Sequence, residues 1–269
     1  MNAVTTPARF RDLIAAEWIK LWSLRSTRWL LGLGAVVLIG LSVQGSASTA
    51  ADWPTYTLRE RAGYDPMTEI LDSATAALLL IGAGGVGALT VVGEYATGLI
   101  RPTLAAVPAR HRLVAAKLTL VTGVMLAFGA LVVLVSFAAS QVILSGRGLD
   151  VSLTDPGVLR VLAADTLLAP IAALAGMGLG ALLRHTAATV VAVCAVLVVV
   201  PSFFKPTVYQ WANDLYATVP LYVWRNCLSQ LHPRVSEALP TVSGSWAVFV
   251  LWPLIAALLT LLAVHRRDV

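Results

Sequence analysis

Six long runs of apolar residues dominate the chain, and polar residues gather in the stretches between them. The runs cover residues 29–48, 74–92, 118–144, 158–183, 186–204 and 245–264. Each run approaches or exceeds the roughly 20 residues that a helix needs to cross a bilayer core of ~30 Å. The runs are dense in Leu, Val, Ala and Gly without alternation, which favours helices over the strands of a membrane barrel. The pattern predicts an all-α membrane protein with six transmembrane helices.

The composition agrees with this prediction and excludes a soluble protein. Of the 269 residues, 58% are hydrophobic and 12% are charged, whereas soluble domains have about 45–50% apolar and about 25% charged residues. No repeat or composition shift marks a second domain. We therefore expect a cytoplasmic N-terminal segment at 1–28, one transmembrane domain at 29–264 and a short cytoplasmic tail at 265–269.

The distribution of positive charge predicts the orientation of the helices. Of the 19 lysines and arginines, twelve fall on the side of the two termini and seven on the opposite side, where nine acidic residues outweigh them. Because lysine and arginine near helix ends are retained in the cytoplasm, both termini should be cytoplasmic, in a multi-pass protein of the cell membrane. The same bias explains the net charge of +5, so we expect no nucleic-acid partner.

An amphipathic helix is predicted just before the first apolar run, lying in the inner membrane interface. Glu17 falls inside its apolar arc, where a carboxylate is costly without a partner. Pairing with Lys20 three residues later and contact with another helix or chain both remain open. The arc follows the i, i+3/i+4 spacing and consists of Phe10, Leu13, Ile14, Trp18, Leu21 and Leu24.

The segment 93–117, GEYATGLIRPTLAAVPARHRLVAAK, is strongly basic and lies between two apolar runs. It is too short for a domain, and we interpret it as a docking surface on the cytoplasmic face. On the outer side, the segment 205–244 is rich in aromatic residues that favour the membrane interface. There we expect short re-entrant or surface helices broken at Pro220 and Pro233.

Few residues point to chemistry within the spans. Asp165 is an acid in the fourth run, and it lies either at the outer headgroup level, if the helix begins near residue 163, or in a polar contact lining a substrate path. Gly82, Gly84 and Gly87 match the letters of a dinucleotide-binding motif, but that motif needs a strand–turn–helix unit, so we interpret them as helix-packing residues. The two cysteines are expected to be unpaired, and we predict no catalytic residue, metal site or cofactor in this chain.

The order of these features resembles the membrane subunit of ABC-2 type ATP-driven transporters. The resemblance covers nearly the whole chain and rests on AEWIKLWSLRSTRW before the first span, the segment 93–117, six spans, the aromatic outer segment and the terminal HRRDV. It implies the ABC-2 fold, a permease dimer of two identical or related chains, and the export of a hydrophobic or amphipathic substrate. Arg101-Pro102 departs from the family pattern at the start of the docking helix.

The resemblance also implies a partner and the residues that contact it. In the family, the segment between spans two and three sits on a cytoplasmic ATP-binding protein, which holds the ATP and magnesium. No phosphate-binding G-x-x-x-x-G-K-[ST] motif occurs in this chain, so hydrolysis would belong to that partner. The alternatives are an intramembrane enzyme and a scaffold or channel without transport activity. The residues expected at the docking surface are Glu94, Tyr95, Gly98, Arg101 and Leu104, together with Glu17.

Overall fold

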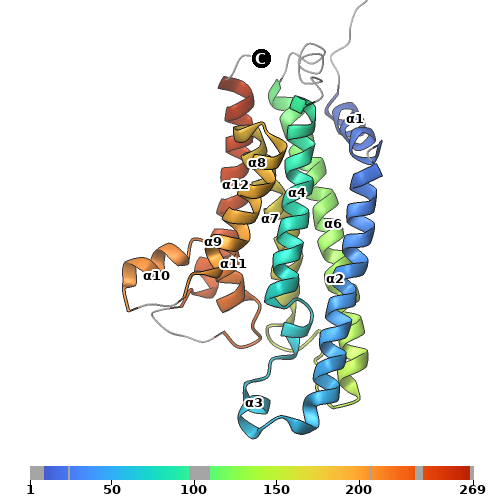
Figure 1. The fold of residues 1–269 in the computed structure, drawn as a ribbon, viewed down its shortest axis with the longest axis vertical. Helices are drawn as coiled ribbons and strands as arrows, with labels where there is room; N and C mark the ends of the chain where they lie inside the picture. The colour runs from blue at the N-terminus through green and yellow to red at the C-terminus, as the bar shows by residue number, and fades with distance from the viewer. Residues whose placement is uncertain (1–8, 24, 97–109, 206–207, 234–238, 267–269) are drawn as a thin grey trace, which may run out of the picture.

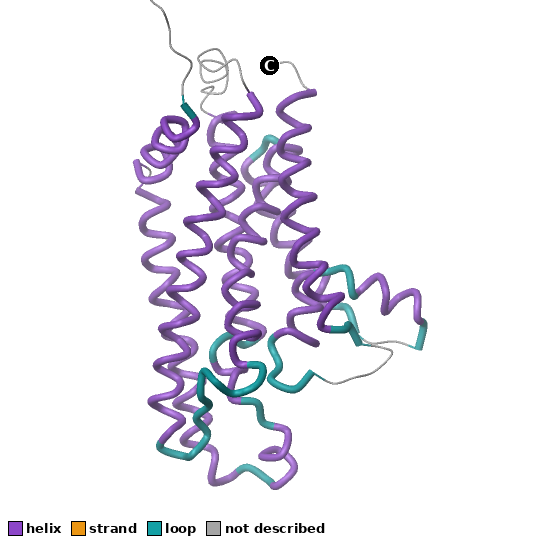
Figure 2. The backbone as a smooth tube through the Cα atoms, turned by 180° about the vertical axis from the view of Figure 1, so that it is seen from behind, coloured by secondary structure: helices purple, strands orange, loops and turns teal. Residues whose placement is uncertain are grey.

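The computed structural model describes residues 9–23, 25–96, 110–205, 208–233 and 239–266. Within these ranges every regular element is a helix, and no strand is present (Figure 2). The predicted all-α fold class is therefore confirmed for the described part of the chain.

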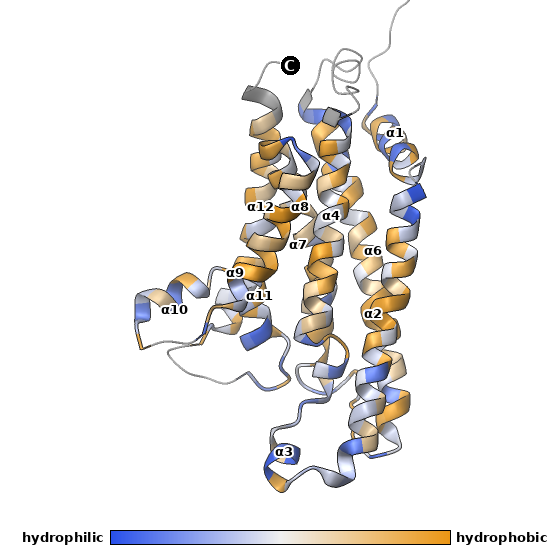
Figure 3. Cartoon of the chain, in the orientation of Figure 1, coloured by the Kyte–Doolittle hydropathy of each residue, from blue (hydrophilic) through white to orange (hydrophobic). Residues whose placement is uncertain are grey.

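Five helices are long and apolar enough to cross a membrane, as expected of a multi-pass membrane protein. The shortest has 24 residues, which at 1.5 Å per residue corresponds to about 36 Å. Figure 3 shows them as largely hydrophobic along their length, with polar residues towards the ends. They correspond to five of the six predicted spans and are α2 (Arg25–Asp52), α4 (Ser73–Ala96), α6 (Arg110–Ser145), α7 (Val158–Leu183) and α12 (Val242–Arg266).

The remaining predicted span, 186–204, is a shorter and less regular helix. It consists of α8 (Thr186–Cys194), the π-helical turn η3 (Ala195–Val199) and α9 (Val200–Ser202). Its 17 residues would extend about 25 Å, less than a ~30 Å bilayer core. The sixth crossing remains a prediction.

Both described ends of the chain lie at the same end of the bundle (Figure 1). The N-terminal helix α1 (Phe10–Ser23) lies at this end, as do the end of α4, the start of α6 and the end of α12. We call this the terminal end. The shared side of the termini agrees with the predicted topology.

Short helices connect the spans at the opposite end. Between α2 and α4 lie η1 (Trp53–Thr55), α3 (Leu58–Gly63) and η2 (Pro66–Glu69). Before α12 lie α10 (Gln210–Tyr216), which projects sideways in Figure 1, α11 (Pro220–Val223) and the π-helical turn η4 (Trp224–Leu228). Pro220 is the first residue of α11, a position where proline lacks only an N–H that would be unpaired anyway.

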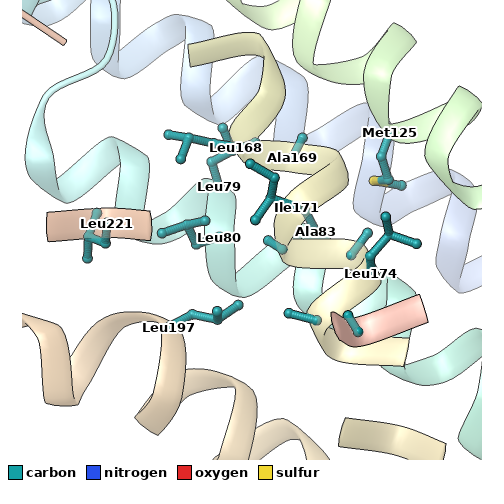
Figure 4. Close-up of a cluster of buried hydrophobic side chains, with 14 of the residues drawn as sticks. Leu79, Leu80, Ala83, Met125, Leu168, Ala169, Ile171, Leu174, Leu197 and Leu221 are labelled. Carbon is teal, nitrogen blue, oxygen red and sulfur yellow. The ribbon is translucent and has the colours of Figure 1, made fainter. Parts of the chain in front are cut away.

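Helix α7 forms the centre of the bundle. It packs most extensively on α4 and also on α12 and α6, and most of its residues are buried. Helix α2, by contrast, is largely exposed along its apolar length, as expected of a helix that faces lipid. Figure 4 shows the core around α7, where aliphatic side chains of α4, α6 and α7 meet Leu197 and Leu221.

Glycines bring α4 and α7 into backbone contact. A Cβ atom added to Gly87 would overlap the backbone of Ala173, and one added to Gly176 would overlap the backbone of Gly84. This confirms the packing interpretation for Gly84 and Gly87 and places the contact within one chain. Gly82 differs, because a Cβ there meets nothing within 4 Å.

A third close approach joins α6 to α7. A Cβ atom added to Gly129 would lie 2.5 Å from the carbonyl oxygen of Thr166 and 3.3 Å from the Ala169 Cβ. Gly129 is near the middle of the 36-residue helix α6. The two helices are therefore held together at the midpoint of α6.

The glycine contacts lead to a stability prediction. Gly87→Ala should lower the melting temperature of the purified protein, because overpacking a tight helix contact costs about 1–3 kcal/mol. The matched control is Gly82→Ala on the same helix, which should melt at or above the wild-type temperature. Thermal unfolding in detergent, followed by circular dichroism, makes the comparison, and equal melting of the two variants would contradict the proposed contact.

The orientation can be tested by cysteine labelling in intact cells. After replacement of Cys194 and Cys227, which are both unpaired, a single cysteine is introduced at Arg61 or at Arg112, two exposed positions at opposite ends of the bundle. If the terminal end is cytoplasmic, an impermeant thiol reagent should label position 61 and leave position 112 unlabelled until the cells are opened. The reverse pattern would overturn the predicted topology.

Candidate functional site

Four charged side chains from three helices meet at the terminal end of the bundle. They are Glu17 and Lys20 of α1, Glu94 of α4 and Lys117 of α6, and we call them the charge cluster. The Lys117 Nζ lies 2.6 Å from the Glu17 Oε2 and 2.9 Å from the Glu94 Oε1. The Lys20 Nζ lies 2.7 Å from the Glu17 Oε1 and 3.0 Å from the same Glu94 oxygen. Each charge is therefore paired with two of the opposite sign.

The inner half of the charge cluster is buried. Glu17 is 3% exposed and Lys117 is 7% exposed, and Lys117 also donates a hydrogen bond to the backbone carbonyl of Thr90 at 3.1 Å. Buried charges are stable only when they are paired and hydrogen-bonded. Removing one partner of such a pair typically costs about 3–5 kcal/mol. The charge cluster therefore restricts the positions of α1, α4 and α6 relative to one another.

Lys20 closes the charge cluster on its more open side. Partial burial alone would lower the pKa of Lys20, but its hydrogen bond to Glu17 and the charge of Glu94 outweigh that effect. The pKa of Lys20 is therefore raised above its ordinary value, and the ammonium stays charged at every physiological pH. The charge cluster holds two positive and two negative groups when all four are ionised.

Local helix geometry explains how the chain brings these groups together. Glu17 and Lys20 are three residues apart, so they lie on neighbouring positions of the α1 surface. Leu13, Glu17 and Leu21 share the buried face of α1, as the predicted apolar arc required. The two alternatives left open for Glu17 are both realised, since it pairs with Lys20 and also contacts another helix.

Both ends of the predicted docking segment are helical. We expected residues 93–117 to lie between two spans, but α4 continues to Ala96 and α6 begins at Arg110. Glu94 and Lys117 are therefore helical residues. Helix α6 thus begins before the apolar run 118–144, and its first turns carry polar residues such as Arg112, which is exposed.

The predicted docking residues divide into two groups. Glu17 and Glu94 are brought together through the two lysines, and Tyr95 belongs to the last turn of α4. Gly98, Arg101 and Leu104 lie outside the described residues. The role of these residues in binding an ATPase stays a prediction.

The sequence reasoning did not identify Lys117 as a site residue, although a signal was present. Lys117 directly precedes the apolar run 118–144, where a helix that extended this run would include it. Glu17, a lone acid within an apolar arc, requires a cation from somewhere in the fold. Considering these two residues together would have suggested the pair.

A small cavity adjoins the charge cluster. It has a volume of about 220 Å³ and is lined by the four charged residues together with apolar and small residues of α1, α2, α4 and α6. Ser23, Thr27 and Thr90 contribute the hydroxyl groups in this lining. The charges are already paired with one another, so the arrangement suits a mechanical link between helices better than a site for acid–base chemistry.

Asp165 lies deeper in the bundle than we expected. Helix α7 begins at Val158 rather than near residue 163, which places Asp165 two turns inside the helix. Its side chain is 1% exposed, and its Oδ1 accepts a hydrogen bond of 2.7 Å from the Trp224 Nε1. The helix start near residue 163, on which the position at the headgroup level depended, is therefore not observed. The hydrogen bond of Asp165 fixes the turn η4 to α7.

No protein-family model matches this chain, and a search of curated proteins gives no match either.

The charge cluster leads to a prediction on stability. Lys117→Met should destabilise the protein by about 3–5 kcal/mol, because it leaves two carboxylates without their shared buried cation. Glu17→Gln combined with Lys117→Met should recover part of this loss, and a double-mutant cycle of melting temperatures in detergent measures the coupling. Arg112→Met is the matched control, since Arg112 is exposed on the same end of α6. Wild-type melting of Lys117→Met would mean that the charge cluster contributes nothing to stability.

Proposed function

We propose that this chain is the membrane-spanning subunit of an ATP-driven transporter of the ABC-2 type, working with a separate cytoplasmic ATP-binding protein. The observation that carries the proposal is the charge cluster. It ties α1 to α4 and α6, the two helices that flank residues 97–109. A partner that pushed on this segment would act on two spans and on α1 together.

The physical argument concerns how a soluble motor can move membrane helices. Force passes efficiently through rigid elements that have few alternative arrangements. Here α4 and α6 run into the segment without a break up to Ala96 and from Arg110, and the buried ion pairs resist separation of their ends. The charge cluster makes one rigid body of the parts of the chain nearest to the proposed docking surface.

The same proposal assigns ATP and magnesium to the partner. The chain has no phosphate-binding glycine-lysine motif, so a transporter built on it needs a second polypeptide that hydrolyses ATP. Two copies of this chain, or one copy with a related permease, would enclose the pathway. The proposed substrate class is a hydrophobic or amphipathic molecule such as a lipid, a drug or a peptide antibiotic, and the proposed direction is export.

The proposal is tested by purifying the tagged chain from its own host. We expect a nucleotide-binding ATPase to co-purify, and its ATP hydrolysis in lipid vesicles should exceed that of the ATPase alone. Gly98→Trp should reduce this stimulation strongly, because a bulky side chain alters the proposed docking surface. Gly63→Trp is the matched control at the opposite end of the bundle, where a Cβ meets nothing within 4 Å, and it should keep full stimulation.

Two outcomes would contradict the proposal. A chain that purifies without any ATPase, yet is folded and inserted, would favour a scaffold or channel. Equal stimulation by the Gly98→Trp and Gly63→Trp variants would show that the segment is not the docking surface, even if an ATPase is bound.

A further inference from the structure

An open apolar groove lies between α1, α2 and α6 at the terminal end of the bundle. We call it the α1 groove. Its volume is about 730 Å³, within the range of about 300–1,000 Å³ that is typical of small-molecule sites. Trp18 and Trp22 of α1 line one side of the groove. Aliphatic or aromatic residues of α2 and α6, such as Leu31 and Phe128, line the other side.

Two glycines create this groove. Gly32 of α2 and Gly123 of α6 both line it, and a Cβ atom added to either meets nothing within 4 Å. These glycines therefore differ from Gly87 and Gly129, which allow helices to touch. At Gly32 and Gly123 the missing side chains leave space that the protein does not fill.

The charge at the groove is positive. Of the described residues that line the α1 groove, one is charged, and it is Arg28. A second groove of about 670 Å³ shares Arg28 and Gly32 and adds Arg25, with Trp29 and Leu33 on its apolar wall. Neither lining includes an acidic residue. Two apolar grooves thus meet beside Gly32. Two arginines, one helical turn apart on α2, line them: Arg28 lines both grooves and Arg25 lines the second.

One unsatisfied donor strengthens the case for a ligand. The Nε1 of Trp22, a residue of the α1 groove, is buried and has no hydrogen-bond partner among the described residues. A buried N–H without an acceptor is costly. An oxygen-bearing group bound in the groove would supply the missing acceptor if it reached this atom.

We propose that the α1 groove binds one anionic phospholipid. Its phosphate would lie on the guanidinium groups of Arg25 and Arg28, which bind phosphate through paired N–H donors. One acyl chain would lie in the α1 groove and the other in the adjoining groove, on either side of Gly32. The apolar walls match acyl chains, and the absence of acids from both linings matches an anionic headgroup.

The bound lipid would complete the packing of α1. The charge cluster holds one side of α1, and the α1 groove opens on the side that carries Trp18 and Trp22. A lipid chain between these rings and Gly123 would fill the space between α1 and α6. Lipid binding and the position of α1 should therefore be linked.

The proposal is tested with delipidated, detergent-purified protein, using native mass spectrometry to count bound lipid and thermal unfolding to measure its effect. Phosphatidylglycerol should bind and raise the melting temperature. Phosphatidylcholine should have a much smaller effect, and inorganic phosphate should have none. The double variant Arg25→Gln, Arg28→Gln should weaken phosphatidylglycerol binding by about tenfold or more, as the loss of charge-assisted hydrogen bonds predicts.

A groove-filling variant tests the apolar part of the site. Gly123→Leu should fold normally, since its Cβ has room, but should block lipid binding. Gly40→Leu is the matched control, because a Cβ at Gly40 also meets nothing within 4 Å and the residue lines neither groove. Arg112→Gln is the control for loss of positive charge.

Several results would overturn the proposal. Equal binding of phosphatidylcholine and phosphatidylglycerol would mean that the arginines do not select the headgroup. An equal effect of inorganic phosphate would reduce the site to an anion site. If Gly123→Leu left lipid binding intact but converted a dimer to a monomer, a second copy of the chain, and not a lipid, would occupy the groove.

Discussion

The terminal end of the bundle is organised by the cost of removing charge from water. A carboxylate on the apolar face of α1 and an ammonium at the interior start of α6 cannot both be buried unless they meet. Glu17 and Lys117 do meet, at 2.6 Å, and Glu94 and Lys20 complete the pairing. This requirement fixes the register of three helices at once. Apolar packing alone would allow α1 to slide or rotate over the bundle, because hydrophobic contact is not directional.

The interior of the bundle is organised differently. Between α4 and α7 the constraint is steric, and glycines allow backbones to approach without any polar group. In lipid such close packing is a main source of helix association, since the surrounding acyl chains are as apolar as the side chains. The structure thus combines a directional electrostatic contact at one end with shape-specific contacts near the middle.

The sequence predicted the helices well because the bilayer imposes a length and a composition on each of them. Five runs appear as long helices, and the amphipathic arc of α1 correctly placed Glu17 on a buried face. The sequence predicted helix ends less well. Polar residues such as Arg110 and Arg112 continue α6 beyond its apolar run, and hydropathy does not detect such an extension. The partners of Glu94 and Asp165 could not be predicted from the sequence. Lys20, Lys117 and Trp224 are distant from them along the chain, and only the tertiary fold brings these residues together.

At Gly129, near its centre, α6 approaches the backbone of α7 closely. With 36 residues, the helix is about 54 Å long, so each half extends about 27 Å from the contact with α7. A tilt of a few degrees about this contact would shift the two tips by an ångström or more in opposite directions. Lys117 lies on one half, and Ser140, which hydrogen-bonds Ser46 of α2 at 2.7 Å, lies on the other. With such a tilt, a small displacement beside the charge cluster would shift the contact between Ser140 and Ser46 in the opposite direction.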